Sequence, residues 1–136
     1  MTTLIDTSVW VDFTRHRSPQ SLKRFIEPIV TADGVALAEP IMFEVMRHIG
    51  DNEAASLRRQ FRLVPVLETP PDLWRMAIDL GQRCSRSGIA VGPLDLLIAT
   101  VAIHHQADLV TFDRGFERIA SVSALRVNVL GRPAVG

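Results

Sequence analysis

The chain has 136 residues, 47% of them hydrophobic and 22% charged, a balance that fits one globular domain and excludes a disordered protein. Fifteen basic residues cancel fifteen acidic ones, which excludes a protein that coats nucleic acid through a strongly basic surface and restricts any RNA contact to a local patch. The single cysteine, Cys84, excludes an intrachain disulfide, and with the absence of a signal-peptide pattern it favours a soluble protein of the cytoplasm with no membrane partner.

Strand patterns and helix patterns alternate along the chain. Short apolar runs bounded by Gly, Pro or polar residues indicate buried strands, and longer segments with apolar residues every three or four positions indicate helices. Ser18-Pro19 and Gly92-Pro93 have the form of helix starts. We expect five strands, at residues 3–5, 35–38, 63–67, 109–112 and 125–130. Between them we expect helices from 18–19 to about 30, at 41–49 and 52–62, from 71 to about 87, from 92 to 104 and from 115 to about 120.

This alternation predicts an α/β domain in which a central parallel sheet is flanked by helices on both faces. No repeat, low-complexity stretch or linker divides the sequence, so we expect a single domain over residues 1–136. Pro65 assigns the 63–67 strand to an edge of the sheet, because proline cannot donate to a ladder. Sheets of this kind place their ligand sites outside the carboxyl ends of the strands, near a topological switch point.

Four acidic residues have large apolar neighbours: Asp6, Glu44, Asp95 and Asp113. A buried carboxylate is costly, so each needs a partner or a raised pKa. Asp6 and Asp113 each end a predicted strand, and the other two lie near the starts of helices that begin at the same edge of the sheet. Four carboxylates that converge there repel one another unless a cation lies between them, and all-oxygen ligation suits Mg²⁺ or Mn²⁺ rather than zinc.

Each of these acids also has a local explanation. Asp6 can cap a helix or form an Asx-turn, and Asp95 can complement a helix dipole. Asp113 can belong to a turn, and Glu44 can pair with Arg47 on its own helix. One shared metal site accounts for all four acids more simply than four separate coincidences.

Other catalytic patterns are not found in the sequence. Lys23 is the only lysine and does not stand in a Gly-Lys-Ser/Thr step, which excludes a Walker P-loop. The chain has no His-Glu-x-x-His, Cys-x-x-Cys or Gly-x-Ser-x-Gly segment. We interpret Asp12 as the solvated surface of a helix, and Trp10 and Trp74 as core or interface residues.

The opening segment Leu4-Ile5-Asp6-Thr7-Ser8-Val9-Trp10-Val11-Asp12 resembles that of PIN-domain ribonucleases, specifically the VapC-type toxins of bacterial toxin–antitoxin pairs. Three later segments resemble the remaining acidic motifs of this family. The segment Ala38-Glu39-Pro40 running to Glu44 is similar to the second, Asp95-Leu96-Leu97-Ile98-Ala99 to the central one and Thr111-Phe112-Asp113-Arg114-Gly115-Phe116 to the last. The resemblance covers essentially the whole chain, and the motifs follow one another in the family's order.

The resemblance implies a compact PIN domain that acts as an endoribonuclease with Mg²⁺, or with Mn²⁺ as a substitute. It further implies the role of a toxin in a type II toxin–antitoxin pair, with a cognate antitoxin, an RNA substrate and a homodimer. Ser8 and Thr111 fall on small hydroxyl positions that commonly support the site. The family's catalytic, metal-binding positions fall on Asp6, Glu44, Asp95 and Asp113.

The chain departs from the family pattern at Gly115, where many relatives carry another acid. For the second acidic position we favour Glu44 over the nearby Glu39, because Glu44 lies deeper in the apolar helical segment. Attack by a metal-activated water would leave 5′-phosphate and 3′-hydroxyl ends.

Because an acidic pocket repels RNA, rim arginines must hold the flanking phosphates. The candidates for this role are Arg15, Arg17, Arg86 and Arg114. One alternative function is a catalytically silent PIN-like module that binds RNA or protein. A haloacid-dehalogenase-like phosphatase is disfavoured, because that class needs Asp-x-Asp where this chain has Asp6-Thr7-Ser8.

Overall fold

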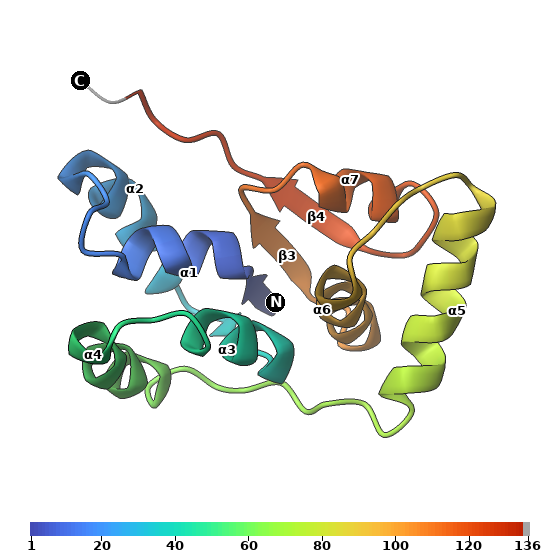
Figure 1. Ribbon diagram of the computed structural model, residues 1–136, viewed down its shortest axis with the longest axis horizontal. Coiled ribbons are helices and arrows are strands. Elements are labelled where there is room, and N and C mark those ends of the chain that lie inside the picture. Colours follow the sequence, from blue (N-terminus) through green and yellow to red (C-terminus); the bar gives the residue numbers. More distant parts are fainter. Residues whose placement is uncertain (135–136) are drawn as a thin grey trace.

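The computed structural model describes residues 1–134 and contains a four-stranded, all-parallel sheet with strand order β2-β1-β3-β4 (Figure 1). The predicted α/β class is confirmed, and residues 135–136 of the expected domain lie outside the described residues. The strands are β1 (Thr3–Ile5), β2 (Val35–Ala36), β3 (Asp108–Thr111) and β4 (Arg126–Val129). The helices are α1 (Thr7–Thr14), α2 (Gln20–Val30), α3 (Glu39–Met46), α4 (Asp51–Phe61), α5 (Leu73–Arg86), α6 (Pro93–His104) and α7 (Gly115–Ala120).

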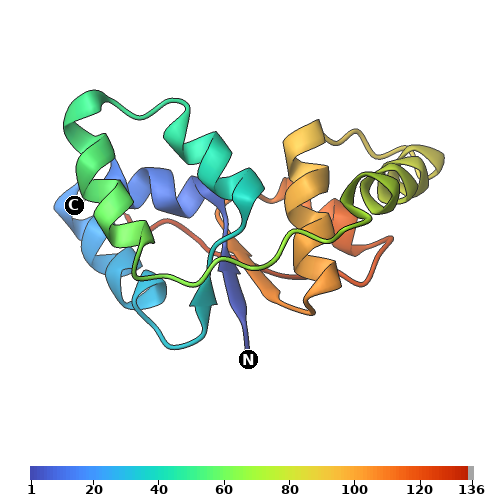
Figure 2. The same cartoon turned by 90° about the horizontal axis from the view of Figure 1, so that it is seen from below.

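The strand order places a topological switch point between β1 and β3. From β1 the chain adds β2 on one side, and it later returns to add β3 and β4 on the other side. Thr3 is in register with Val35 of β2 and with Asp108 of β3. Figure 2 shows β1 and β2 side by side and running in the same direction. The carboxyl ends of β1 and β3 are therefore the expected place for a site.

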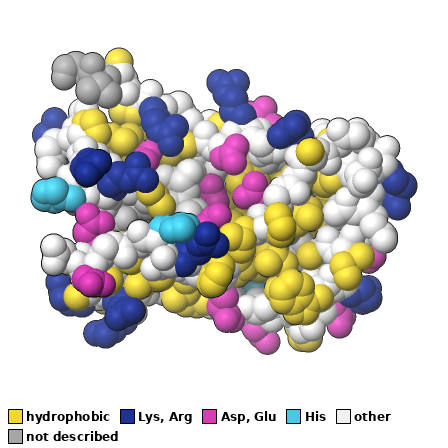
Figure 3. Space-filling view, viewed as in Figure 1, with side chains coloured by type: hydrophobic (Ala, Val, Ile, Leu, Met, Phe, Trp, Pro, Cys, Tyr) yellow, Lys and Arg dark blue, Asp and Glu magenta, His cyan; other side chains and the backbone are white. Residues whose placement is uncertain are grey.

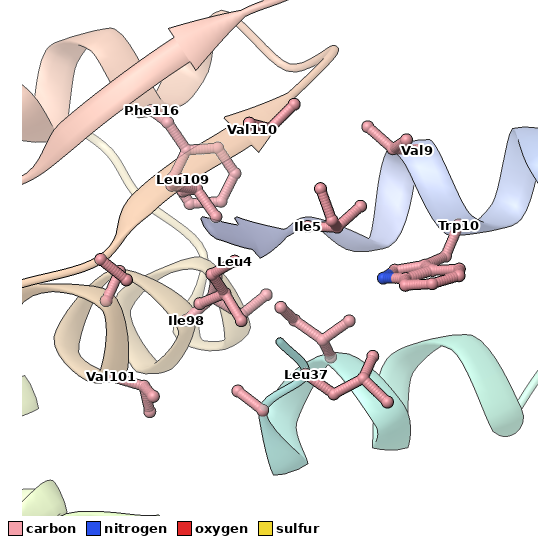
Figure 4. Close-up of a cluster of buried hydrophobic side chains, with 14 of the residues drawn as sticks. Leu4, Ile5, Val9, Trp10, Leu37, Ile98, Val101, Leu109, Val110 and Phe116 are labelled. Atoms are coloured by element: carbon pink, nitrogen blue, oxygen red, sulfur yellow. The ribbon is translucent and has the colours of Figure 1, made fainter. Parts of the chain in front are cut away.

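Apolar side chains from β1 and β3 form the centre of the core (Figure 4). Both strands are short apolar runs, as expected for a sheet that is covered on both faces. The helices add large side chains, and the Trp10 ring meets the Phe61 ring edge-on at 5.1 Å between centroids. The core side chains labelled in Figure 4 are Leu4, Ile5, Val9, Trp10, Leu37, Ile98, Val101, Leu109, Val110 and Phe116.

Helix α6 lies between the sheet and α5, and it also contacts α3 (Figure 1). A helix that is covered on several sides must be apolar nearly all round, and the segment from Leu94 to Ile103 meets this requirement apart from Asp95 and Thr100. The Thr100 hydroxyl donates to the Leu96 carbonyl at 2.6 Å and so needs no other partner. Asp95 is consequently the exceptional residue of this helix.

Several predicted elements differ from the structure. The expected strand at residues 63–67 is reduced to a single bridge between Leu37 and Val66, because Pro65 has no N–H to donate and Leu63 is 84% exposed. Helix α1 was given no bounds in the prediction, although Asp6 was interpreted as a possible helix cap and Asp12 as part of a helix surface, and both belong to this helix in the structure. The helix predicted at 41–49 begins two residues earlier, with Pro40 in its first turn, and ends at Met46.

The structure also corrects one of the side-chain interpretations. Asp12 is not solvated, because its carboxylate accepts from Arg132 Nε at 2.8 Å and its side chain is only 14% exposed. Trp10 is a core residue as predicted, whereas Trp74 is 70% exposed and has no place in the core of this chain. Among the described helices, none combines the length and the apolar character needed to cross a bilayer.

Candidate active site

The four predicted acids are carried by elements that meet at the switch point. Asp6 follows β1 and is the N-cap of α1, and Asp113 lies two residues beyond β3. Asp95 is in the first turn of α6 and Glu44 is in the second turn of the neighbouring α3. Figure 3 shows acidic side chains gathered near the centre of one face of the molecule. The charges of the other three all act on Asp95 and raise its pKa, so the four carboxylates form one electrostatic group.

Two hydroxyls hold the Asp6 carboxylate in place. Thr111 Oγ1 donates to Asp6 Oδ2 at 2.7 Å, and Ser8 Oγ donates to the same oxygen at 2.9 Å. The Asp113 N–H donates to Thr111 Oγ1 at 2.9 Å, and the Phe112 N–H donates to Ser8 Oγ at 3.0 Å. Because each hydroxyl accepts from a backbone N–H, its own proton is directed to Asp6.

Burial and mutual repulsion disfavour the charged forms of two of these acids. Asp6 is only 4% exposed, and its burial raises the pKa of its carboxyl above the ordinary value, although the hydrogen bonds from Thr111 and Ser8 oppose this effect. For Asp95, burial and then the charges of Asp6, Asp113 and Glu44 raise the pKa to about 6. Within residues 1–134, none of the four acids forms a salt bridge.

This donor set fits a divalent cation by its chemistry. It offers only carboxylate oxygens, which Mg²⁺ and Mn²⁺ prefer, and its negative charge has no basic partner in the described part of the chain. The carboxylates are not already drawn together, because no three acidic, histidine or cysteine side chains between residues 1 and 134 are grouped closely enough to hold a metal ion as they stand. The carboxylates repel one another without a cation, and a bound cation would relieve that repulsion.

Two of the acids have the local roles expected from the sequence and also belong to the acidic group. The Asp6 carboxylate accepts from the Ser8 N–H at 3.4 Å as a helix cap, and Asp113 Oδ1 accepts from the Gly115 N–H at 2.8 Å in a turn. A side chain at position 115 would place its Cβ 3.1 Å from Asp113 Oδ1. The glycine that departs from the family pattern therefore gives the Asp113 carboxylate room.

The structure separates the two glutamates that competed for the second acidic position. Glu39 is exposed and accepts from Thr69 Oγ1 at 2.7 Å, and its charge is not among those that raise the pKa of Asp95. Glu44 contributes to the field at Asp95. Within residues 1–134 it does not form the ion pair with Arg47 that the local explanation required, and Arg47 Nε donates to His48 Nε2 at 2.9 Å. Glu44 thus remains our choice for the second acid.

The arginines expected at the rim lie in different places. Arg15 and Arg17 line a hollow of about 500 Å³ at the end of α1, which also contains Arg132. Arg114 directly follows Asp113, and Arg86 is the last residue of α5, so it is carried by a helix that bears none of the four acids. Sequence reasoning did not select Arg132, since only the packing of the C-terminal segment against α1 brings it to this hollow.

A second hollow, of about 550 Å³, lies directly beside the acids, between α3 and the start of α6. Sequence reasoning singled out only the two acids among its lining residues. The residues that line it are Phe43, Glu44, Arg47, His48, Gly92, Pro93, Leu94 and Asp95.

Known proteins resemble this chain over nearly its full length. The family model described as PIN domain matches residues 3–122. The VapC ribonuclease Mb1587 of Mycobacterium bovis is 31% identical over 129 residues, which are 90% of this chain and 95% of that protein. The solved structure of VapBC2 from Rickettsia felis, bound to a DNA fragment from its promoter, is similar with a TM-score of 0.77 and 19% identity, covering 96% of this chain and 100% of that one. VapBC-5 from Mycobacterium tuberculosis, of the VapBC family of toxin–antitoxin systems, has a TM-score of 0.66 and 21% identity and covers 95% of this chain and 98% of that one.

Proposed function

This chain belongs to the PIN-domain family and is related to VapC ribonucleases, and from that premise we propose that it is the endoribonuclease toxin of a type II toxin–antitoxin pair. It acts in the cytoplasm and depends on Mg²⁺, for which Mn²⁺ can substitute. The observation that carries the proposal is the group of four carboxylates at the switch point, which repel one another and have no basic partner in residues 1–134. Asp6, Glu44, Asp95 and Asp113 are the proposed catalytic and metal-binding residues.

The chain's own residues have distinct tasks in this reaction. Ser8 and Thr111 orient the Asp6 carboxylate through the hydrogen bonds to its Oδ2. Asp95 and Glu44 are carried by α6 and α3, Asp113 lies beyond β3, and the charges of Asp6, Asp113 and Glu44 all act on Asp95. When bound, a divalent cation supplies positive charge for a phosphate oxygen and lowers the pKa of water.

The products follow from the nucleophile. Hydrolysis by water, without attack by the ribose 2′-hydroxyl, leaves a 5′-phosphate and a 3′-hydroxyl. The four acids repel the RNA backbone, so arginines at the rim must hold the phosphates on either side of the cut. Arg114 is one such candidate because it directly follows Asp113.

Cleavage by the purified, antitoxin-free protein tests this function. We expect RNA to be cut with Mg²⁺ or Mn²⁺ and not with EDTA, and we expect sequencing of the new ends to find 5′-phosphates. The Asp6→Asn variant removes a charge while keeping the size of the side chain, and it should be inactive. Tight RNA binding that ignores EDTA, without cleavage, would instead favour a catalytically silent binding module.

Exposed apolar side chains support the proposed protein partners, a cognate antitoxin and a second copy of this chain. Trp74 and Ile78 are one turn apart on α5 and are 70% and 58% exposed. Figure 3 shows hydrophobic side chains gathered on the same face as the acids. Such patches mark interfaces.

Light scattering of wild-type protein and of a Trp74→Ser variant tests the homodimer, and a monomeric wild type at micromolar concentration would contradict it. The antitoxin is tested by co-purification of a small protein from the native operon.

A further inference from the structure

The hollow between α3 and the start of α6, which we call the α3–α6 groove, contains more than the acids. Glu44 and Asp95 line it together with Pro93 and Leu94, two apolar residues of α6. Its volume of about 550 Å³ falls within the roughly 300–1,000 Å³ that small-ligand sites span. In Figure 3 hydrophobic side chains lie directly beside the central acids.

Phe43 is the aromatic side chain of this groove, and the packing of the fold does not explain its position. It is 57% exposed, whereas the other phenylalanines of the chain are buried or half-buried. The guanidinium of Arg47, one turn further along α3, lies 5.8 Å from the centre of the Phe43 ring. Arg47 Nε also donates to His48 Nε2 at 2.9 Å, which restricts the directions the guanidinium can take. An exposed ring and an oriented positive charge therefore stand side by side.

We propose that the α3–α6 groove binds one unpaired nucleotide of RNA next to the scissile phosphate, with its base stacked on Phe43 and a phosphate held by Arg47. The inference rests on the proposed ribonuclease function, which places the scissile phosphate at the four acids. A neighbouring nucleotide must then lie in one of the hollows that adjoin them, and this groove shares Glu44 and Asp95 with the site.

The chemistry of the lining favours RNA over a second copy of the chain. A protein surface closing the groove would bury the charges of Glu44 and Asp95, which have no basic partner in residues 1–134, at a high desolvation cost. A bound nucleotide leaves the groove open to water and offers a chemical partner to the ring, the guanidinium and the carboxylates. Its base has a face for Phe43, its phosphate accepts from Arg47 and its ribose hydroxyl can donate to a carboxylate.

Stacking has consequences for the substrate class. Every base has an aromatic face, so a pocket that works by stacking tolerates all four bases. A base inside a duplex has both faces covered and cannot enter the groove. The enzyme should therefore cut single-stranded segments, and sequence preference must arise elsewhere along the RNA.

Variants of Phe43 test the proposal. Phe43→Leu keeps an apolar side chain but removes the aromatic face, and Phe43→Tyr restores that face. Leu63→Ala is the matched control, because Leu63 is an exposed apolar residue outside the groove. For a single-stranded RNA, Phe43→Leu should raise KM about tenfold with little change in kcat, and Phe43→Tyr and Leu63→Ala should resemble wild type. Arg47→Gln should raise KM and flatten its dependence on salt.

A binding assay keeps this inference separate from the proposed function. Fluorescence anisotropy with a single-stranded oligoribonucleotide is measured in the Asp6→Asn background with and without Phe43→Leu, with thermal unfolding as the check of folding. About tenfold weaker binding with Phe43→Leu supports the groove even if wild type does not cleave RNA. Unchanged affinity would overturn the proposal, and so would a Phe43→Leu protein that loses its dimer while keeping the wild-type KM. If wild type does not cleave RNA but Phe43→Leu still weakens RNA binding, the result would count against the proposed nuclease function and not against the groove.

Discussion

Replacing Asp95 by asparagine should stabilise the metal-free protein while abolishing cleavage. The reason is that Asp95 carries a charge in an unfavourable place, where burial and the carboxylates of Asp6, Asp113 and Glu44 raise its pKa from 3.8 to about 6. At 1.36 kcal/mol per pKa unit, such a shift corresponds to about 3 kcal/mol. Solvent screening at the partly exposed Asp95 reduces this to about 1–2 kcal/mol.

The pH dependence of this difference follows from the direction of the pKa change. A carboxyl whose pKa is raised by folding binds its proton more tightly in the folded state. Its unfavourable contribution is therefore absent below the unfolded pKa of 3.8, grows as the pH rises to about 6 and is constant above that. Asp95→Asn removes this contribution, so its advantage over wild type should be full at pH 7.5 and small at pH 4.5.

Thermal unfolding in EDTA measures the effect. For a chain of this size, about 1–2 kcal/mol raises Tm by about 3–8 °C. Asp79→Asn is the matched control, because Asp79 is exposed on α5 and forms no ion pair within residues 1–134. Added Mg²⁺ should stabilise wild type more than Asp95→Asn, since binding to the folded state adds stability. An Asp95→Asn protein that melts at or below the wild-type temperature in EDTA at pH 7.5 would refute the electrostatic argument, and full cleavage activity would refute the site.

Three other expectations concern the residues around the site. Thr111→Val removes the hydroxyl between Asp6 and the Asp113 N–H, so it should lower the free energy of unfolding by about 1–3 kcal/mol in chemical denaturation and reduce cleavage in an activity assay. Thr111→Ser keeps the hydroxyl and should retain the wild-type stability and the wild-type cleavage rate. Arg132→Gln breaks the pair with Asp12 and should cost up to about 1 kcal/mol in the same denaturation assay, an effect that high salt diminishes. RNA affinity measured against salt should give a slope on the order of −2 to −3, because three or four phosphate contacts on a neutral chain each contribute about −0.7; a much steeper slope would indicate a dedicated RNA-binding surface.

The acids could be found from the sequence because each stands at a strand end or in an early helical turn among apolar residues. Their flanking residues fix their positions locally, and the parallel topology then brings those positions to one edge. The Asp12–Arg132 pair has no such signal, because its partners are 120 residues apart and meet only when the C-terminal segment packs against α1. Phe43 was not singled out, because its apolar neighbours Ile41 and Met42 do not indicate that its ring is exposed.

Helix α1 shows how one residue can serve both the secondary structure and the site. Its β-branched residues lower its helix propensity, and the Asp6 carboxylate, which accepts from the Ser8 N–H, caps its start. The same Asp6 carboxylate accepts hydrogen bonds from the hydroxyl of Ser8 and, across the switch point, from that of Thr111. Capping a helix and joining the acidic group are thus compatible, because the cap and the hydroxyls fix the position of the carboxylate without neutralising its charge.

The uncompensated negative charge of the four acids determines which ligands the site attracts. The hydrogen bonds of Ser8 and Thr111 hold Asp6 near the other acids although burial disfavours its ionised form. Whatever positive charge enters the site relieves the same repulsion, whether a divalent cation or an arginine of a partner protein supplies it. A metal ion and an antitoxin that carries an arginine would then bind to the same four carboxylates, and each would weaken the binding of the other. Arg47 lies outside this competition, because it is engaged with His48 and Phe43 and does not pair with Glu44.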